Sequence, residues 1–368
     1  MKAVIMAGGE GTRLRPLTSN QPKPMMPLAN RPMMEHIVRL LKSHGFEDIV
    51  VTLAFLPQTI RTYFGDGAEF GVRMVYATEE TPLGTAGSVR NASAELDEPF
   101  LVISGDVLTD IDLTTQIAQH ERTGATGTLA LVPVLDPSSY GLVSLAGDGA
   151  VEQFLEKPAA DTVRQTNLIS AGAYVLERSV LELIAPGRNV SIEREVWPLL
   201  VDHGLYGYVD DDAYWIDVGT PDRYLQATFD ILEGNVRTCM AEKLGDDFLA
   251  VDPSAQVDGR AVPPAVVGAG ARIAEGAHVG SLAVLGDDVS VGTGSVIERA
   301  VVLAGAQIGE GCVLRSCIVG PGARVGDRTH VIGGAMLGDG AVIGADNVIA
   351  HGARLSPGME VPDGGLVF

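Results

Sequence analysis

The sequence predicts two domains of different architecture, an α/β domain over residues 1–245 and a parallel β-helix over residues 246–368. Three observations support this prediction. A chain of 368 residues is longer than one compact domain usually is. Short β-rich segments alternate with helical segments as far as about residue 233, and the last third of the chain repeats with a period of six residues. Strands that alternate with helices indicate a mostly parallel sheet covered on both faces.

The elements of the first domain are expected in the order of its apolar runs. The predicted strands are KAVIMA, DIVVTL, VRMVYA, FLVIS, GTLALVPV, GLVSL, AVEQFLE and NLISAGAYVLE. A helix is expected from Asn30, because Pro32 suits a first turn, apolar residues recur at helical spacing and Gly45 marks the end. Further helices are expected near residues 85–94, 112–122, 191–203 and 221–233. Together these elements predict a Rossmann-like domain with a mixed, mainly parallel sheet.

The second domain is predicted from a change in composition and a column of aliphatic residues. Residues 249–368 hold 23 of the 45 glycines and no lysine. Hexapeptide repeats of this kind are typical of a left-handed parallel β-helix, with one inward aliphatic side chain on each flat side and small residues at the corners. A disordered linker has no such phased column. The column, with two five-residue steps, is Val267, Ile273, Val279, Leu285, Val291, Ile297, Leu303, Ile308, Leu314, Val319, Val325, Val331, Leu337, Ile343, Ile349 and Leu355.

Charge and cysteine content exclude several classes of partner and location. The net charge of −21 argues against nucleic acid and against anionic membranes, since a polyanion would be repelled. Residues 1–42 nevertheless carry seven Lys or Arg against two acidic residues, so this segment could hold a small anion. There is no signal peptide or membrane span, and three cysteines without a CxxC pair favour a soluble protein of the reducing cytoplasm.

A glycine-rich loop follows the first predicted strand as Gly8-Gly9-Glu10-Gly11-Thr12-Arg13-Leu14. It lacks the Lys of a GxxxxGK[ST] P-loop and has Leu14 at the third glycine of a GxGxxG fingerprint. What remains is a set of exposed backbone N–H groups, Arg13 as a two-donor phosphate ligand and Lys23 ten residues later. On spacing alone, a flexible β-α turn with surface cations is an equal alternative.

Five stretches in order resemble the sugar-1-phosphate nucleotidyltransferase family, also called NDP-sugar pyrophosphorylases. The first is MAGGEGTRLRPLT with PKPMMPLANRPM, and the β-helix resembles the second domain of such enzymes. The resemblance covers nearly the whole chain and implies transfer of a nucleotidyl group from a nucleoside triphosphate to a sugar 1-phosphate. The other four stretches are Pro82-Leu83-Gly84-Thr85-Ala86-Gly87, Ser104-Gly105-Asp106-Val107, Phe154-Leu155-Glu156-Lys157-Pro158 and Trp215-Ile216-Asp217-Val218-Gly219.

The resemblance also implies roles for particular residues. Arg13 and Lys23 would hold the triphosphate, and Asp106 and Asp217 would bind Mg²⁺ through carboxylate oxygens. Lys157 would hold the sugar phosphate, and these five residues form the expected catalytic set. The expected nucleotide-binding residues are Ala7, Gly8, Gly9, Gly11, Thr12, Arg13, Lys23, Pro82, Gly84, Thr85 and Asp106. The expected sugar-phosphate contacts are Gly141, Glu156, Lys157, Asn167 and Gly172.

The expected specificity for base and sugar rests on only a few residues. Uridylyl- and thymidylyl-transferring relatives typically carry a Gln near the PLGTAG position, where Pro82 stands here. Proline offers no donor to a pyrimidine edge, so guanine is favoured. Within the family the chain looks most like members that use GTP and mannose 1-phosphate to make GDP-mannose. Ser170 stands where many relatives carry a second Asn, which leaves the sugar contacts open.

Several alternatives remain at this point. One alternative is an enzyme specific for a pyrimidine nucleotide, which would transfer a thymidylyl or uridylyl group from dTTP or UTP to glucose 1-phosphate. The β-helix could add acyltransferase activity through His278, His330 or His351, since such domains often use a His base. A non-catalytic regulatory subunit is a third alternative, although Arg13 and both metal aspartates are intact. The exposed faces and ends of the β-helix also predict a homo-oligomer.

Overall fold

The protein was analysed as a computed structural model that describes residues 1–96, 98–157 and 166–366. The chain divides into two compact units, each built from two stretches of sequence. The sheet unit comprises Met1–Gly9 and Ile37–Trp215, and the solenoid unit comprises Glu10–His36 and Ile216–Phe368. The expected domain boundary after residue 245 stays a prediction.

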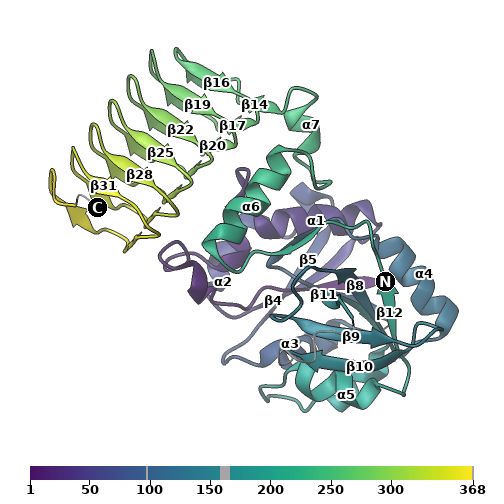
Figure 1. Cartoon of the computed structure of the whole chain (residues 1–368). Helices are drawn as coiled ribbons and strands as arrows, with labels where there is room; N and C mark the ends of the chain where they lie inside the picture. The colour runs from purple at the N-terminus through teal and green to yellow at the C-terminus, as the bar shows by residue number, and fades with distance from the viewer. Residues whose placement is uncertain (97, 158–165, 367–368) are drawn as a thin grey trace. The chain divides into compact units, whose positions relative to one another are not determined.

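The sheet unit is built on a nine-stranded mixed sheet (Figure 1). Its main path runs β10-β9-β11-β6-β1-β4-β5, and β8 and β12 continue from β11. The run β6-β1-β4-β5 and the pair β8-β12 are parallel, while β11 pairs antiparallel with β6, β8 and β9. The strands are β1 (Lys2–Met6), β4 (Asp48–Leu53), β5 (Arg73–Thr78), β6 (Phe100–Ser104), β8 (Gly127–Pro133), β9 (Gly141–Leu145), β10 (Val151–Glu156), β11 (Leu168–Leu176) and β12 (Leu205–Val209). The predicted Rossmann-like α/β fold is therefore confirmed.

The parallel strands bring four chain segments to one edge of the sheet. Parallel strands end on the same side, so the residues after β1, β4, β5 and β6 share that edge. These include Gly8, Ala54, Glu79 and Asp106. The middle of β1 and nearly all of β4 are buried, as expected for strands covered on both faces. Ligands of open α/β sheets bind outside such carboxyl ends.

Two of the expected helices differ from the structure, and the helices Pro57–Phe64 and Ala241–Leu244 were not expected from the sequence. The first helix begins at Met33 rather than Asn30, because Asn30 has a left-handed backbone (φ 62°) and Arg31–Pro32 pairs with Pro27–Leu28 as a short ladder. The segment expected as a helix over 191–203 is a π-helical turn over Ile192–Val196 followed by a short helix that ends at Leu200. The helices are α1 (Met33–Ser43), α2 (Pro57–Phe64), α3 (Gly84–Asn91), α4 (Leu113–Thr123), α5 (Trp197–Leu200), α6 (Pro221–Leu232) and α7 (Ala241–Leu244).

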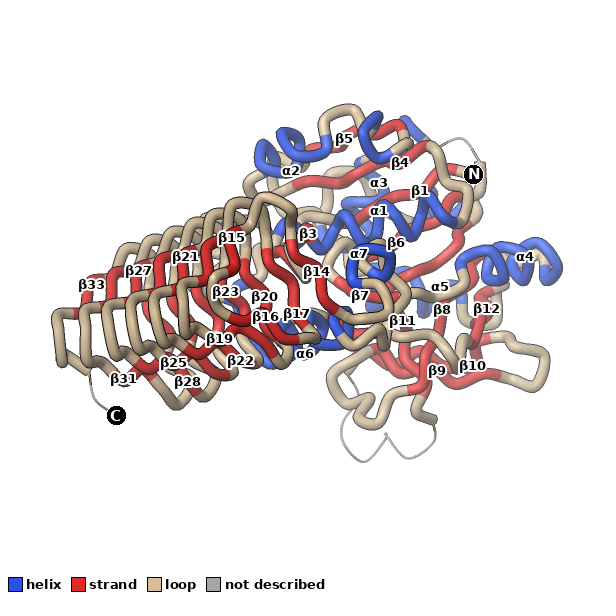
Figure 2. Tube along the Cα trace, turned by 90° about the horizontal axis from the view of Figure 1, so that it is seen from above, coloured by secondary structure: helices blue, strands red, loops and turns tan. Residues whose placement is uncertain are grey.

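The solenoid unit contains three parallel sheets that stack coil upon coil (Figure 2). The first solenoid sheet is β14 (Leu249–Val251), β17 (Ala265–Val267), β20 (Ala283–Leu285), β23 (Val301–Val302), β26 (Ile318–Val319), β29 (Met336–Leu337) and β32 (Arg354–Leu355). The second is β15 (Gln256–Val257), β18 (Arg272–Ile273), β21 (Ser290–Val291), β24 (Gln307–Ile308), β27 (Arg324–Val325), β30 (Val342–Ile343) and β33 (Glu360–Val361). The third is β16 (Arg260–Val262), β19 (His278–Gly280), β22 (Val296–Glu298), β25 (Val313–Arg315), β28 (His330–Ile332) and β31 (Val348–Ile349). The predicted left-handed β-helix of hexapeptide repeats is confirmed.

The inward column agrees with the predicted aliphatic residues except at one position. Val302, fully buried in the solenoid core, takes the place that was assigned to Leu303. Val302 pairs with Leu285 on one side and Val319 on the other, so the five-residue step lies between Ile297 and Val302. Leu303 follows strand β23 and is not part of that core. The repeat alone did not reveal which of two neighbouring aliphatic residues turns inward.

No helix within the described residues is long and apolar enough to span a bilayer.

Candidate active site

The first glycines of the loop lie directly after β1 in the sheet unit. The backbone N–H of Ala7 donates to the carbonyl oxygen of Thr52 at 3.1 Å, which extends the β1–β4 ladder. A Cβ placed on Gly8 would lie 3.4 Å from the Ala54 Cβ and 3.7 Å from Oε1 of Glu79. Gly9 is exposed and would meet nothing within 4 Å. Because Gly8 and Gly9 have no side chains, the backbone at this edge is open to the close approach of a phosphate.

The loop continues in the solenoid unit, where Gly11 is fixed by its neighbours. Its backbone is left-handed (φ 62°), and a Cβ there would lie 2.8 Å from the Lys23 Cβ. Its carbonyl oxygen accepts from the N–H of Leu14 at 2.9 Å and from the hydroxyl of Thr18 at 2.8 Å. Thr12 follows, exposed, at the start of a 3-10 turn over Thr12–Leu14. Glycine at position 11 therefore avoids strain in the left-handed backbone and leaves room for the Lys23 side chain.

Arg13, Lys23 and Asp217 form one cluster, which we call the Asp217 cluster. The Lys23 ammonium lies 3.2 Å from Oδ1 of Asp217, and the Arg13 Nη2 lies 3.8 Å from Oδ2. The side chain of Lys23 is only 5% exposed, whereas that of Arg13 is 68% exposed. A Cβ on Gly219 would lie 2.6 Å from the Arg13 Nη2, so glycine makes room for the guanidinium. Two motifs almost 200 residues apart in sequence thus meet, as the resemblance implies.

The PLGTAG stretch leads into α3 and forms its first turn, and it contacts a neighbouring segment of the sheet unit. Pro82 is exposed, and its carbonyl oxygen accepts from Nδ2 of Asn189 at 3.0 Å. Gly84 has φ 70°, and a Cβ there would lie 2.6 Å from the carbonyl oxygen of Val190. The Thr85 hydroxyl donates to Glu193 at 2.9 Å and accepts from the N–H of Ile192 at 2.8 Å. The nucleotide contacts of these residues remain predictions.

Asp106 is half-buried and follows the end of β6 by two residues. The preceding Gly105 donates its N–H to the carbonyl oxygen of Met6 at 2.9 Å, which ties the turn to β1. Gly172 interrupts β11 with φ 75°, and a Cβ there would lie 2.9 Å from the Ser104 Oγ. The register of β11 against β8 shifts at the same place, between Ser170 and Tyr174. A backbone irregularity in β11 therefore lies beside the strand that leads to Asp106.

Lys157 and Glu156 stand at the end of β10 opposite the start of β9. Lys157 has a left-handed backbone (φ 48°), and its N–H donates to the carbonyl oxygen of Tyr140 at 3.1 Å. The Lys157 ammonium lies 3.6 Å from Oε1 of Glu156 and its side chain is 61% exposed. A Cβ on Gly141 would lie only 2.5 Å from the Phe154 ring. The ammonium is thus available to an anion, while Pro158 of this motif lies outside the described residues.

Asn167 is exposed just before β11, and its carbonyl oxygen accepts from the N–H of Val134 at 3.0 Å. Ser170, where many relatives carry Asn, is half-buried in β11. Neither position tests the expected sugar contacts.

Sequence reasoning missed Glu79. This carboxylate is 8% exposed, and Oε2 accepts from the N–H of Leu83 at 3.0 Å. Its other oxygen is buried and has no hydrogen-bond partner among the described residues. The available signal was the acidic pair Glu79-Glu80 after a strand that ends at the same edge as β1.

The three histidines proposed for acyl transfer do not form a group. His278 and His330 precede the inward Val279 and Val331, so both lie on the outer face of the third solenoid sheet. His351 is exposed at a corner with φ 54°. Within residues 1–96, 98–157 and 166–366, no three His, Cys, Asp or Glu side chains gather as a complete metal site.

Comparison with known proteins gives concordant results. Residues 2–234 match the family described as Nucleotidyl transferase, and residues 261–363 match the GMPPB C-terminal domain. A mannose-1-phosphate guanylyltransferase of Mycobacterium tuberculosis is 40% identical over 306 residues, covering 81% of this chain and 83% of the relative. A UTP–glucose-1-phosphate uridylyltransferase of Synechocystis is 32% identical over 347 residues, covering 89% and 86%. The structure of HddC from Yersinia pseudotuberculosis complexed with GMP-PN is 26% identical, with a TM-score of 0.54 over 62% of this chain and 99% of that one. From its glycine loop to its last coils, the chain belongs to the nucleotidyl transferase family.

Proposed function

We propose that the chain transfers a guanylyl group from GTP to mannose 1-phosphate, giving GDP-mannose and pyrophosphate. The observation that carries this proposal is the Asp217 cluster, in which two cations from the first motif meet a carboxylate from the last. The 40% identity to a mannose-1-phosphate guanylyltransferase supports the choice of substrates.

The proposed reaction requires alignment rather than a catalytic base. A phosphate oxygen of the sugar 1-phosphate attacks the α-phosphorus, and the bond from that phosphorus to the pyrophosphate oxygen breaks. A phosphomonoester has its second pKa near 6, so the attacking oxygen is already anionic at neutral pH. The difficulty is repulsion between two anions and the charge that develops on the leaving pyrophosphate. Cations and backbone donors address both.

The cations divide between the two reactants. Arg13 and Lys23 would hold the triphosphate together with backbone N–H groups of Ala7, Gly8, Gly9, Gly11 and Thr12. Lys157 would hold the phosphate of the sugar. Buried against Gly11, the Lys23 stem fixes its ammonium more tightly than the exposed Arg13 is fixed. Arg13, whose exposed guanidinium lies 3.8 Å from Asp217, is the group that we assign to the charge developing on the leaving pyrophosphate.

Asp106 and Asp217 are the proposed protein ligands of Mg²⁺. The donor chemistry fits, because a hard divalent ion takes carboxylate oxygens and completes its shell with phosphate oxygens and water. Both oxygens of Asp217 lie within 4 Å of a cationic side chain, so the carboxylate stands where positive charges already gather. When bound, the ion would neutralise charge on the departing pyrophosphate. Lys23 and Arg13 would then exchange the carboxylate for phosphate oxygens.

Selection of base and sugar is proposed from the remaining residues. Pro82 offers no side-chain donor to a pyrimidine, and Gly84 and Thr85 would line the nucleotide beside it. Gly141, Glu156, Asn167 and Gly172 would contact the sugar, with Glu156 accepting from its hydroxyls. Transfer of a uridylyl or thymidylyl group to glucose 1-phosphate is the second candidate, favoured by the 32% identity to a uridylyltransferase.

A substrate grid separates these candidates. The protein is incubated with Mg²⁺, five nucleoside triphosphates and several sugar 1-phosphates, and pyrophosphate release is followed. Strong release with GTP and mannose 1-phosphate supports the proposal. Preference for UTP or dTTP with glucose 1-phosphate would replace the substrates and keep the chemistry. Absence of release from any pair would reject catalysis, and a parallel acetyl-CoA assay tests the acyltransferase alternative.

We further propose a cytoplasmic homo-oligomer that associates through the β-helix. Cys312 and Cys317 are unbridged thiols buried in the solenoid core, which suits a reducing compartment. The second solenoid sheet exposes Val257 and Val342, each more than a third exposed. Light scattering after size-exclusion chromatography measures the mass directly, and a monomer of 38.5 kDa would contradict association.

A further inference from the structure

One face of the β-helix is hydrogen-bonded to the segment that carries the triphosphate-binding residues. Nδ2 of Asn30 donates to the carbonyl oxygen of Leu285 at 2.6 Å. Nδ2 of Asn20 lies 3.4 Å from Oδ2 of Asp339. Arg354 Nη1 donates to the carbonyl oxygen of Arg13 at 3.0 Å and contacts that of Arg15 at 3.4 Å. All of these contacts lie within the solenoid unit.

The β-helix partners belong to a single face. Leu285 ends β20 and Arg354 begins β32, both in the first solenoid sheet, and Asp339 lies in the turn after β29 of the same sheet. Leu355 is buried and points into the coil, so the neighbouring Arg354 points outward. The first solenoid sheet therefore contacts the segment at three coils, separated from it by 255 to 341 residues of chain.

The Arg354 contact is made to the backbone of the functional loop itself. The carbonyl of Arg13 belongs to the 3-10 turn Thr12–Leu14, whose side chain at Arg13 faces Asp217. A guanidinium that donates to two carbonyl oxygens of one turn restrains the dihedral angles between them, and a charged donor strengthens both bonds. The Arg15 side chain is paired with Glu10 at 3.2 Å, and the Arg354 contacts are to carbonyl oxygens only. Arg354 thus acts on main chain, and the Arg13 guanidinium stays available.

Asp339 provides a second fixed point. It is half-buried in the turn Gly338-Asp339-Gly340, where Oδ1 has no hydrogen-bond partner among the described residues. Asn20 supplies a donor to Oδ2 and is exposed otherwise. The Asn20 contact is a long, exposed hydrogen bond to the other oxygen, and it gives the segment a second attachment to this sheet.

The outer part of the loop is where such support matters. Leu14, Leu17 and Thr18 are buried and anchor the loop from inside, whereas Thr12, Arg13 and Arg15 are exposed. Ordering a flexible backbone costs conformational entropy at each residue. A donor aids a transition state most when it is held in place before the reaction, since no reorganisation is then required.

We propose that the first solenoid sheet, through Arg354 and Asp339, holds the loop over residues 10–22 in the conformation that presents Arg13 to the triphosphate. Arg354 is thus a positioning residue of the transferase site, and the β-helix has a role in catalysis besides association. This inference rests on the proposed function, because it assumes that the loop binds a nucleoside triphosphate.

The test compares Arg354→Ala with Arg324→Ala in the full-length protein. Arg324 is a matched control, since it too is exposed and directly precedes an inward aliphatic residue, but in the second solenoid sheet. Arg354→Ala is expected to raise the KM for the triphosphate about tenfold, the loss of one charge-assisted contact, and to change the KM for the sugar phosphate less than twofold. Arg324→Ala should leave both constants unchanged.

Two further measurements separate positioning from simple loss of structure. Arg354→Lys should recover part of the loss, and millimolar guanidinium should partly rescue Arg354→Ala. Hydrogen exchange of the peptide over residues 10–22 should speed up in Arg354→Ala and not in Arg324→Ala. Asn20→Ala, an exposed substitution, should raise the KM for the triphosphate about threefold if Arg354→Ala proves unstable.

The outcome that overturns the inference is a folded Arg354→Ala protein with unchanged triphosphate KM and unchanged loop exchange. Kinetics are measured with whichever substrate pair the wild type turns over best, so a change of base or sugar does not affect the result. If no pair is turned over, the proposed function fails on its own. The dissociation constant of MgGTP, measured by calorimetry, then replaces KM under the same criterion.

Discussion

At the scale of single residues, Lys23 illustrates how a charged side chain is kept in a nearly buried position. Its stem packs against Gly11, and its ammonium faces Asp217 at 3.2 Å. Lysine is almost never this buried unless it is paired. The same pairing keeps the ammonium directed at the place where phosphates are proposed to bind, at the cost of competition from the carboxylate. Arg13, more distant from Asp217 and mostly exposed, is not restrained in this way.

Removing Arg13 should affect turnover more than folding. Arg13→Ala is expected to lower kcat with the best substrate pair by about 10²–10³, the usual loss when one transition-state donor is deleted. Thermal unfolding should be nearly unchanged, because the side chain is exposed. Steady-state kinetics and a melting curve test both statements. A kcat within a factor of three of the wild type would contradict the assigned role.

Gly141 should be sensitive to a single added methyl group. In Gly141→Ala the new Cβ would lie 2.5 Å from the Phe154 ring, which is too close for any real contact. We expect a loss of about 1–3 kcal/mol in unfolding free energy through overpacking. Gly147→Ala is the control, since a Cβ there would meet nothing within 4 Å, and it should change stability by less than about 0.5 kcal/mol. Equal stability of the two variants in denaturant titrations would show that the ring moves away freely.

His120 predicts a pH dependence of stability. It is 3% exposed, and its Nδ1 lies 2.9 Å from the Thr128 hydroxyl. Burial lowers the pKa of His120 below its ordinary value, with Glu177 opposing the shift. The unfolded chain therefore binds the proton more readily, so His120 contributes stability above about pH 6.5 that is lost as the pH falls toward its lowered pKa. Unfolding free energy measured at pH 7.5 and 5.5 should fall more in the wild type than in His120→Gln, and equal slopes would contradict this.

Much of the site could be predicted at this scale, because it depends on residue identity. The motifs named Arg13, Lys23 and Asp217 by residue identity, and the structure brings these three side chains together, while their roles stay predictions. Glu79 could not be predicted in the same way. Its significance comes from an unpaired buried oxygen beside Gly8, which depends on how three strands align. Arg354 could not be predicted for the same reason, because it is far from the loop in sequence and shares no motif with it.

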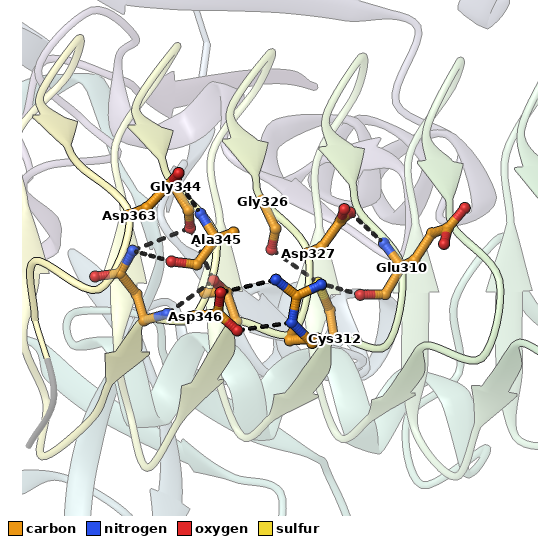
Figure 3. Close-up of polar contacts among 11 residues, drawn as sticks. Glu310, Cys312, Gly326, Asp327, Gly344, Ala345, Asp346 and Asp363 are labelled. Atoms are coloured by element: carbon orange, nitrogen blue, oxygen red, sulfur yellow. Dashed lines mark hydrogen bonds and ion pairs between the residues drawn. The ribbon is translucent and has the colours of Figure 1, made fainter.

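At the scale of elements, the coils of the β-helix are joined at their corners by aspartates (Figure 3). Oδ1 of Asp327 accepts from the N–H of Glu310 at 2.8 Å, and Oδ1 of Asp363 accepts from that of Ala345 at 2.7 Å. Asp287 accepts from the N–H of Ala269 at 2.8 Å in the same way, at the corner that follows the first solenoid sheet rather than the second. Each aspartate thus satisfies a backbone donor that the sharp corner leaves unpaired. Among the described residues this contact occurs at these three places, so it supplements the aliphatic column rather than repeating with it.

Asp327 should therefore contribute more to the stability of the β-helix than Asp346, an acidic residue of the next coil. Asp327→Ala leaves the Glu310 N–H without its acceptor, and we expect a loss of about 1 kcal/mol in the unfolding of the β-helix. Asp346 binds Arg328 through two contacts of 2.7 Å, but both side chains are more than half exposed. Asp346→Ala should accordingly cost less, since exposed ion pairs contribute little. Denaturant titrations of both variants give the order, and the reverse order would be contrary to this reading.

Elements were predicted well where periodicity was strong and less well where tertiary contacts decided. Strands β4, β6 and β9 coincide with the expected runs. The start of α1 was misplaced because Asn30 adopts a left-handed backbone and its amide is used elsewhere. The exchange of Leu303 for Val302 has a similar origin, since pairing with Leu285 and Val319 decides which valine or leucine turns inward.

At the scale of the whole molecule, a strongly acidic protein must hold two anionic substrates. The net charge is −21, whereas residues 1–42 carry a local excess of positive charge. Basic residues concentrated at one segment focus attraction where it is needed, while the acidic remainder disfavours polyanions. The three cations assigned to the substrates, Arg13, Lys23 and Lys157, carry less charge than a triphosphate and a sugar phosphate together, which gives the proposed divalent ion a clear task.

Removal of divalent ions should therefore stop turnover reversibly. Excess EDTA is expected to abolish pyrophosphate release with the best substrate pair, and added Mg²⁺ should restore it. Ca²⁺ should restore less, because it favours longer bonds and a looser shell than Mg²⁺. Asp217→Asn should raise the Mg²⁺ concentration needed for half-maximal rate. Full activity in EDTA would contradict the proposed metal role.

The two outermost anchor points on the first solenoid sheet also set a length. Asn30 is bonded at β20 and Arg13 at β32, with β23, β26 and β29 stacked between them. Adjacent parallel strands are about 4.8 Å apart, so one coil more or fewer between these points would displace Arg354 by that distance and leave the Arg13 carbonyl out of reach. The number of coils beyond either anchor can vary during evolution. The number of coils between the two anchors is fixed, because the N-terminal segment must reach both contacts.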